Sequence, residues 1–406
     1  IFVLVKHSGA YGRSASPVHF LSHPEPVEML VYHLTIRRNV MPFRQSVVTD
    51  LAPGSWALND GQQGLVTAAR QFARDRLEPL LGGAPDSARW DETVRLAAAL
   101  DLATMILPEQ RGGMDISRHD LALVIEQFAA GPLERAAELT LSSAALMTLR
   151  KYGALDLLPD HNIQHYLDGT TSIAPGIPDV DASGFWVLRR HACSQAMMVR
   201  MDGERPQLVL ATLTERRDTG RCSSVALPGP LSIERYTTVP AGDTPLRVVS
   251  NGATAEGNLV RQWLVDAATY FAALLSGAVQ QGVTFALAYS AYRQTFRKPI
   301  TAHQLVAVRL ADMLISAHTI HLFLRSIAAR DPQPDIAPVR SMAHHIATEA
   351  LDVARELVQL CGGHGYVESL PPAARFQTMH WFAMLLIKLE AGLGALAAPD
   401  VHQRES

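Results

Sequence analysis

Histidine is the residue type whose spacing in this chain first raises metal chemistry, because zinc sites combine paired histidines with further acidic, histidine or thiolate ligands. The chain has sixteen histidines. His318 and His321 lie close together, and His344 and His345 are adjacent. Both pairs fall in long helical patterns, and neither is accompanied by the further ligands, at metal-binding spacing, that a site requires. The sequence therefore predicts no metal site.

The most informative stretch is residues 266–313. It reads as a long apolar helix, a short basic and aromatic connection, and a second long helix. The first helix is apolar on more than one face, as expected when neighbouring elements cover it on several sides. Pro299 is predicted to stop it, because proline disfavours helical geometry in the preceding residue. Thr301 followed by Gln304 predicts a capping box that starts the second helix. The rest of the chain is expected to be organised around this pair.

Two sequence blocks carry a resemblance to a known family. The run YRQTFRKPITAHQLVAVRLADM, residues 292–313, resembles the R-x-x-F-G-x-P-I, H-Q and L-A-D-M pattern of the acyl-CoA dehydrogenase family. The later run VQLCGGHGYVESLPPAARF, residues 358–376, is similar to the family's Q-x-x-G-G-x-G-Y segment. Because the order and separation of the blocks both fit, the chain is identified as a divergent member of this family.

The resemblance implies FAD as cofactor. In the family the Arg of R-x-x-F meets the pyrophosphate of the neighbouring subunit's flavin, the Phe packs near its adenine end, and the later Gln and Gly-Gly line the same cofactor. Carried over by motif, the cofactor-binding positions are Arg293, Thr295, Phe296, Gln304, Gln359, Gly362 and Gly363.

These positions also have local structural readings. Arg293 at a helix C-terminus is favourable through the helix dipole alone, Gln304 serves the capping box, and Gly362-Gly363 predicts a glycine C-cap of a helix from Ser341. One departure matters, because Arg297 stands where the family has Gly. If that position requires positive φ, Arg297 is strained there; it could instead add a second cation.

Removal of the α-proton of an acyl thioester requires a base. The resemblance places it as Glu in an E-G-T segment after the second block, and here that position is Leu386; the alternate family position is Ala267. Two acids lie nearby. Glu390 is the candidate catalytic base if the preceding helix is one turn longer than usual. Asp266 is a weaker candidate, because adjacent helix residues point about 100° apart.

The resemblance supports three functions. The first is an FAD-dependent acyl-CoA or acyl-carrier-protein dehydrogenase with a relocated base. The second is a catalytically silent subunit that completes a partner's flavin site, and the third is a flavin oxidase or monooxygenase on the same scaffold. The expected substrate is the acyl thioester, and a further candidate partner is an electron-acceptor flavoprotein. The helical bundle is expected to form either a homodimer or homotetramer, or a hetero-oligomer with a paralogous subunit.

The predicted fold is mainly α with a small β domain. Residues 1–56 are an N-terminal extension outside the core, with Met41 as the expected natural start. Residues 57–170 form a helical domain whose helices begin at Asn59-Asp60 and at Ser117 with Asp120, with a further helix over 134–152. Residues 171–258 form a small antiparallel sheet or barrel, and residues 259–406 a four-helix bundle. The family's flavin-holding T-E-P-x-A-G-S-D and W-I-T segments are absent from the β part.

Composition and charge argue against nucleic-acid binding, a disulfide framework and a membrane span. A net charge of −3 gives no basic footprint for nucleic acid. The three cysteines contain no CxxC arrangement, which argues against a disulfide framework. No apolar run approaches the ~20 residues that span a bilayer, so no membrane span is expected, and a reducing cytoplasm is the expected location.

Overall fold

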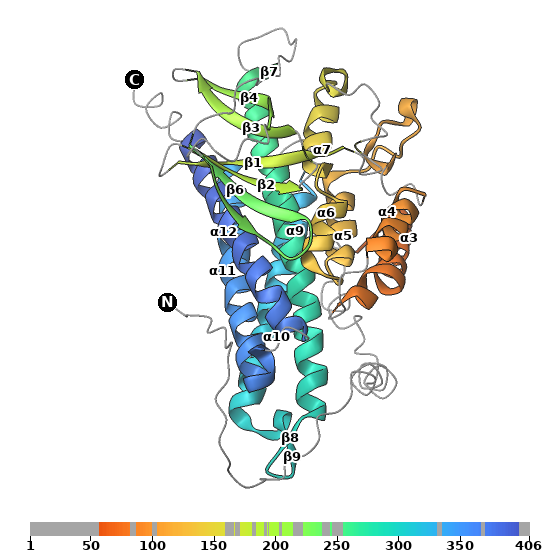
Figure 1. Ribbon diagram of the computed structural model, residues 1–406, viewed down its shortest axis with the longest axis vertical. Coiled ribbons are helices and arrows are strands. Elements are labelled where there is room, and N and C mark those ends of the chain that lie inside the picture. The colour runs from red at the N-terminus through yellow and green to blue at the C-terminus, as the bar shows by residue number, and fades with distance from the viewer. Residues whose placement is uncertain are drawn as a thin grey trace, which may run out of the picture. The chain divides into compact units, whose positions relative to one another are not determined.

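The computed structural model describes residues 57–81, 87–99, 104–158, 166, 171–180, 184–190, 193, 195–202, 205–213, 222–237, 244–245, 255–330, 335–366 and 370–397. The predicted extension over residues 1–56, including Met41, lies outside them. The described chain contains helices, a central sheet and a second set of long helices in that order (Figure 1). This order confirms the predicted fold class.

Five short α-helices open the described chain: α3 (Asp60–Phe72), α4 (Ser87–Ala99), α5 (Arg118–Phe128), α6 (Leu133–Leu139) and α7 (Ser143–Lys151). Capping boxes at Asn59 and at Ser117 start α3 and α5, as predicted. The single helix expected over 134–152 is wrong, because it is divided into α6 and α7. The Thr140 hydroxyl donates to the Ala136 carbonyl and the Ser143 hydroxyl to the Thr140 carbonyl, and such local bonds compete with helix propagation.

A seven-stranded sheet follows, with the strand order β5-β6-β2-β1-β3-β4-β7. Its strands are β1 (Ile173–Asp179), β2 (Gly184–Arg190), β3 (Gln195–Asp202), β4 (Arg205–Thr212), β5 (Cys222–Ala226), β6 (Leu231–Tyr236) and β7 (Thr244–Pro245). All pairs are antiparallel except β1 with β3, which is parallel. The central strand β1 carries two prolines and a glycine, residues that usually mark loops or edges, so its sequence alone does not indicate a strand.

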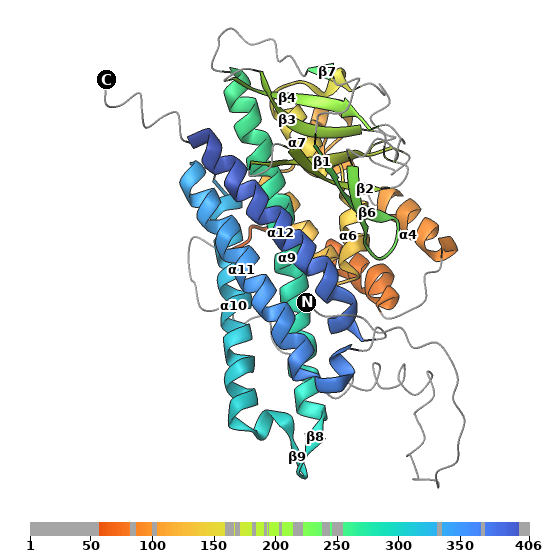
Figure 2. The ribbon, with the colours of Figure 1, turned by 60° about the vertical axis from the view of Figure 1, so that its left-hand side comes forward.

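Four long helices complete the fold: α9 (Ala255–Tyr292), α10 (Gln304–Ala328), α11 (Ile336–Leu360) and α12 (Pro371–Ala397). They run side by side in both ribbon views (Figures 1 and 2), which confirms the predicted bundle. Helix α9 contacts α10, α11 and α12 as well as α5, α7 and β4. Its side chains Trp263 and Phe271 are fully buried, so α9 is the element around which the other layers pack.

Helix α9 ends at Tyr292, directly before the predicted connection at Arg293. Pro299 is not the residue that stops it, because a two-stranded hairpin formed by β8 (Gln294–Thr295) and β9 (Lys298–Pro299) lies in between. Two other predicted helix boundaries are wrong. The Thr301 capping box does not form, since residues 300–302 make a 3-10 turn and His303 is the N-cap of α10 without a side-chain bond. Helix α11 begins at Ile336 rather than Ser341, because a proline in the first helical turn is tolerated.

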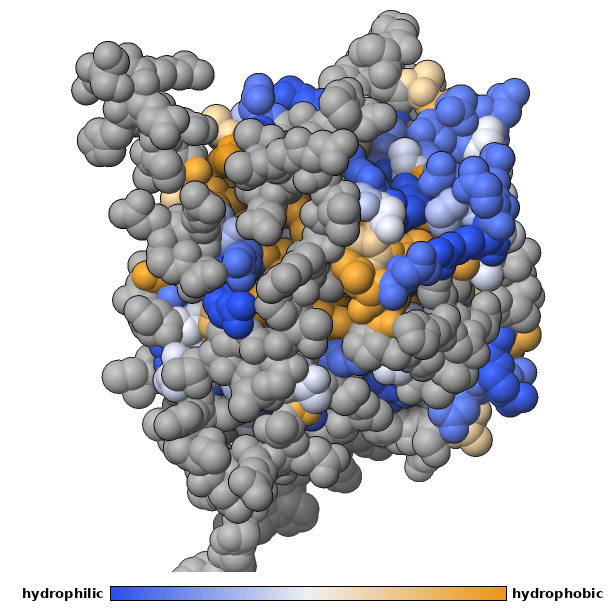
Figure 3. All heavy atoms as spheres, turned by 90° about the horizontal axis from the view of Figure 1, so that it is seen from above, coloured by the Kyte–Doolittle hydropathy of each residue, from blue (hydrophilic) through white to orange (hydrophobic). Residues whose placement is uncertain are grey.

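Three of the described helices, α9, α10 and α12, are long and apolar enough to cross a membrane when judged by length and composition alone. The expectation that no segment meets this criterion is therefore corrected. In the structure α9 is largely covered by other elements, whereas much of α10 is not. Figure 3 shows the molecule from the end where the sheet lies. Apolar residues gather near the centre of this face, and hydrophilic residues lie along one side of it.

Candidate functional site

The first predicted cofactor motif forms the β8–β9 hairpin at the C-terminal end of α9. Gln294 pairs with Pro299 and Thr295 with Lys298, which leaves Phe296 and Arg297 as the two turn residues. Both have positive φ, 52° for Phe296 and 63° for Arg297. Two-residue hairpin turns of the I′ type require positive φ at both positions and favour Asn-Gly. The position occupied by Arg297 therefore does adopt the backbone that favours glycine.

The hairpin presents cations and an aromatic ring to solvent. The side chains of Arg293, Arg297 and Lys298 are exposed, and among the described residues none of them forms an ion pair. Phe296 is 91% exposed, and its ring meets the His303 ring edge-on at 6.2 Å. A phosphate-bearing ligand with a planar ring requires such groups, because guanidinium donates to phosphate and also stacks on aromatic faces.

The second predicted motif lies at the same end of α9. Tyr289 connects the two motifs, because its backbone carbonyl accepts from the Arg293 N–H at 2.8 Å and its hydroxyl donates to the Cys361 carbonyl at 3.3 Å. Gly362 has φ 57° at the end of α11, which confirms the predicted glycine C-cap. The Gln359 amide donates to the Tyr366 hydroxyl at 3.0 Å.

The structure thus places the seven predicted cofactor residues on three features of one bundle end. Arg293, Thr295 and Phe296 lie on or beside the hairpin, Gln304 is the first residue of α10, and Gln359 is followed by Gly362-Gly363 at the end of α11. Their role in binding a cofactor stays a prediction. All seven residues are exposed or half-buried, so they are accessible to a ligand.

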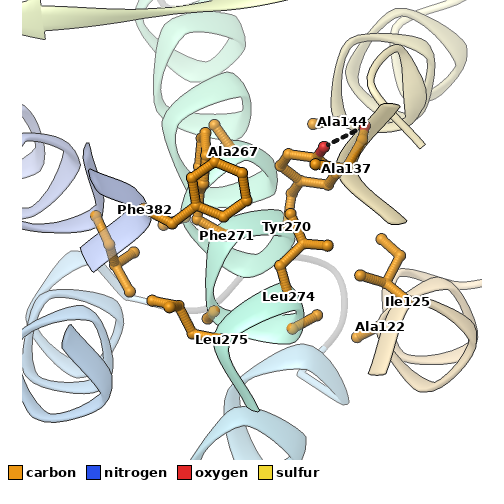
Figure 4. Packing of buried hydrophobic residues seen from close by; sticks show 14 of the residues in the cluster. Ala122, Ile125, Ala137, Ala144, Ala267, Tyr270, Phe271, Leu274, Leu275 and Phe382 are labelled. Atoms are coloured by element: carbon orange, nitrogen blue, oxygen red, sulfur yellow. Dashed lines mark hydrogen bonds between the residues drawn. The ribbon is translucent and has the colours of Figure 1, made fainter. Parts of the chain in front are cut away.

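The two family positions for the catalytic base lie in the apolar core. Leu386 on α12 and Ala267 on α9 are fully buried in the main hydrophobic cluster. Figure 4 shows the surroundings of Ala267, where the rings of Phe271 and Phe382 lie together; their centroids are 5.6 Å apart in an edge-to-face contact. Neither position can accept a proton, and neither faces solvent.

Asp266, the acid beside Ala267, is a buried ion-pair residue. Its carboxylate accepts from the Arg118 guanidinium at 2.6 Å and from the Thr148 hydroxyl at 2.8 Å. The Gln262 amide donates to both of its oxygens, at 2.9 and 2.8 Å. With four bonds from α5, α7 and α9, the carboxylate stabilises the contact between the N-terminal helices and the bundle.

Glu390, the predicted base, lies one helical turn beyond Leu386 on the unbroken helix α12. One carboxylate oxygen is 3.2 Å from His344 Nδ1, and the other is 3.7 Å from an Arg340 nitrogen. Both partners belong to α11, so in this structure the carboxylate is directed at α11. Its catalytic role stays a prediction, which requires the side chain to leave these partners.

Sequence reasoning missed a charged contact between the sheet and the bundle. The Lys388 ammonium on α12 donates to one oxygen of the buried Asp179 at 2.8 Å, and the Arg235 guanidinium donates to the other at 3.0 Å. Burial alone would raise the pKa of the Asp179 carboxyl, but these two cations outweigh it and hold the pKa below its ordinary value. The contact joins the end of β1 to α12, in the β region where the resemblance places flavin-holding segments.

A second missed group is a buried carboxylate between α5, α9 and α10. One oxygen of Glu126 accepts from the Ser276 hydroxyl at 2.5 Å and the Gln280 amide at 3.1 Å, and lies 2.9 Å from His321 Nδ1. The sequence gives no signal for this group, because its members are 150 or more residues apart from Glu126. Its bonds satisfy one buried oxygen and tie the N-terminal helices to the bundle.

Comparisons with known proteins agree with this architecture. The family model of the acyl-CoA dehydrogenase N-terminal domain matches residues 59–157, and that of the C-terminal domain matches residues 258–385. Mitochondrial isobutyryl-CoA dehydrogenase from Bos taurus is 22% identical in an alignment 367 residues long, which covers 80% of this chain and 85% of that protein.

Solved structures share the fold at low sequence identity. Butyryl-CoA dehydrogenase from Megasphaera elsdenii superposes with a TM-score of 0.64 and 17% identity, over 86% of this chain and all of that one. PigA, solved with FAD and proline, superposes with a TM-score of 0.60 and 17% identity, over 84% of this chain and all of that one.

Proposed function

Because the chain belongs to the acyl-CoA dehydrogenase family, we propose that it is an FAD-dependent oxidoreductase acting on an acyl thioester, with acyl-CoA as the expected form. The observation that carries the proposal is the bundle end, where exposed cations and an exposed aromatic ring lie beside a glycine turn. When bound, FAD would supply the acceptor for the hydride that leaves the β-carbon of the substrate.

The residues present fit the phosphate and adenine parts of FAD. Arg293 offers guanidinium donors for the pyrophosphate, and Phe296 offers a ring face that no described residue covers. Gln359 can exchange its bond to Tyr366 for a bond to the cofactor, since both side chains are exposed. Gly362, with positive φ, leaves room for close approach by a ligand. Beyond its chain neighbours, no heavy atom of the described residues lies within 4 Å of the position that a Cβ would take there.

An outward-facing apolar stripe on α10 supports an oligomer. Leu305 is 80% exposed, and Val308, Ile315 and Leu322 follow with exposures of 52, 60 and 38%. The last three recur every seven residues, the spacing by which helices pack along a shared seam. We propose that a second copy of the chain, or a paralogous subunit, covers this stripe, and that the adjacent hairpin contributes to the flavin site of that neighbour.

A second function is favoured by one specific observation. Both family positions for the base are apolar and buried in the core, at Leu386 and Ala267, and the nearby acids Asp266 and Glu390 are held by cations. A catalytically silent subunit would need the cofactor end of the bundle but no base. The chain would then complete the flavin site of a paralogous partner that supplies the proton acceptor.

The test begins with the visible absorption spectrum of the purified protein, with and without added FAD, and the flavin content per chain. Arg293→Ala should lower the flavin content, whereas Arg330→Ala, a matched exposed arginine on the loop after α10, should not. Anaerobic bleaching of the flavin by acyl-CoA compounds would then support the dehydrogenase.

Three outcomes decide against this proposal. Bound flavin that no acyl thioester bleaches, with a partner chain required for turnover, would favour the silent subunit. Flavin reduced by thioester and reoxidised rapidly by oxygen would favour an oxidase. Protein that takes up no FAD, alone or with partner, would overturn both flavin-dependent proposals.

A further inference from the structure

The tip of the β8–β9 hairpin combines backbone strain with little compensating contact from the described chain. Phe296 and Arg297 both have positive φ, a conformation that is unfavourable for residues other than glycine, asparagine and aspartate. Phe296 is almost fully exposed and Arg297 is exposed. Strained residues persist where surrounding structure or function stabilises them. Here the strand pairs below the turn hold its backbone, while the ring contact recorded for the turn side chains is the edge contact between Phe296 and His303.

The charge around this turn has a single sign over a long stretch. No Asp or Glu occurs from residue 267 to residue 311, whereas Arg293, Arg297, Lys298 and Arg309 all fall within it. Arg309 is engaged with Glu356 at 3.2 Å. The remaining three cations have no acidic partner among the described residues, so the hairpin is a local anion-attracting surface on a chain of net negative charge.

The three cations are not equivalent. Arg293 directly follows the C-terminus of α9, where the negative end of the helix dipole and unpaired carbonyls neutralise part of its charge. Arg297 lies at the far side of the turn, on the tip of the hairpin, away from that helix end. The guanidinium that best retains its charge for an external anion is therefore that of Arg297.

We propose that Arg297 is a second cation for a pyrophosphate, in addition to Arg293, and that its strained backbone is retained because it directs this guanidinium at the ligand. The ligand chemistry is an adenosine diphosphate group, whose adenine suits the exposed ring of Phe296. FAD and CoA both carry this group. The inference rests on the proposed function only in taking such a cofactor or substrate as the physiological ligand.

Arg297→Gly tests the proposal through two effects of opposite sign. Glycine relieves the positive-φ strain, so the melting temperature of the ligand-free protein should rise. The same change should weaken binding of the ligand by about tenfold, because a hydrogen bond to a charged group is lost. If Arg297 had a purely structural role, its substitution would change the melting temperature and the ligand affinity in the same direction. Arg297→Lys should keep part of the affinity but not gain stability.

The measurements are dissociation constants of FAD, CoA and ADP for the purified protein, by equilibrium dialysis, at low and high salt. Arg330→Gly is the matched control for loss of one exposed positive charge. Weaker FAD and ADP binding with unchanged CoA binding would assign the FAD pyrophosphate. Weaker CoA and ADP binding with unchanged FAD binding would assign the CoA pyrophosphate.

Three results would overturn the inference. Wild-type protein that binds FAD or CoA, with Arg297→Gly binding both equally well, would overturn this inference and leave the proposed function standing. Wild-type protein that binds none of the three probes would overturn the proposed function as well. A hairpin that serves only protein contact would lose the oligomer in Arg297→Gly without any change in ligand affinity, and that pattern also contradicts the inference.

Discussion

Replacing Asp266 with asparagine separates a structural role from a catalytic one. The carboxylate and the Arg118 guanidinium are both buried, with side-chain exposures of 3 and 9%. Asparagine keeps an oxygen that can accept from Thr148 and Gln262, but it removes the charge and leaves Arg118 as an unpaired buried cation. Breaking a buried pair from one side costs about 3–5 kcal/mol. Since whole proteins are stable by about 5–15 kcal/mol, Asp266→Asn should be severely destabilised.

Urea unfolding followed by circular dichroism measures this loss, and two variants calibrate it. Asp156→Asn breaks the exposed pair with Arg111, at 2.7 Å and with exposures of 79 and 39%, and should cost less than about 1 kcal/mol. Arg118→Met combined with Asp266→Asn removes both charges and should recover much of the stability. An Asp266→Asn protein as stable as Asp156→Asn would refute the reasoning, and if it also lost turnover, Asp266 would be the base.

Three further outcomes follow from the same structure. Glu390→Gln should lower the free energy of unfolding by less than about 1 kcal/mol, because the side chains of its partners Arg340 and His344 are 42 and 68% exposed; lost turnover at unchanged flavin content would confirm Glu390 as the base. The depressed pKa of Asp179 stabilises the fold above the ordinary aspartate pKa, and this contribution is lost as pH falls through the folded-state pKa. Acid unfolding curves of Asp179→Asn should therefore lack that part of the pH dependence, and identical curves would contradict it. Burial raises the pKa of the Cys361 thiol to about 11, so iodoacetamide at neutral pH should label this residue far more slowly in folded than in urea-unfolded protein; equal rates, by peptide mass mapping, would disprove the burial.

The parts of the fold that were predictable are set by short-range chemistry. The caps at Asn59 and Ser117 depend on a side chain three residues further on. The C-cap of α11 depends on one residue, Gly362, whose positive φ glycine adopts without strain. Local rules also explain the errors. Thr140 satisfies its hydroxyl within its own turn and divides a helix, while prolines in β1 conceal a strand that neighbouring strands stabilise from both sides.

The candidate site was predictable only in part. The hairpin residues are contiguous, so one motif identified them together. The contact that links them to the second motif is not contiguous, since Tyr289 meets Cys361 across 72 residues. The contact of Lys388 with Asp179, between the bundle and the sheet, spans 209 residues. A single sequence contains no signal for such pairs, because each side chain alone has the composition of an ordinary helix or strand surface. The same holds for the four bonds that make Asp266 a buried ion-pair residue.

The difference from the family at the base position extends beyond one residue. Leu386 packs in a core that contains Phe382, Phe271 and Ala267, and α12 continues without a break through that point. A glutamate placed at 386 would be a carboxylate without partners in apolar surroundings, which is strongly unfavourable. Restoring the family's base would therefore require repacking α9 against α12. The cofactor end needs no such rearrangement, because its cations and aromatic ring already face solvent. Chemistry by this chain thus depends on a proton acceptor that reaches the site from outside this core, either Glu390 after leaving its partners on α11 or a residue of a neighbouring subunit.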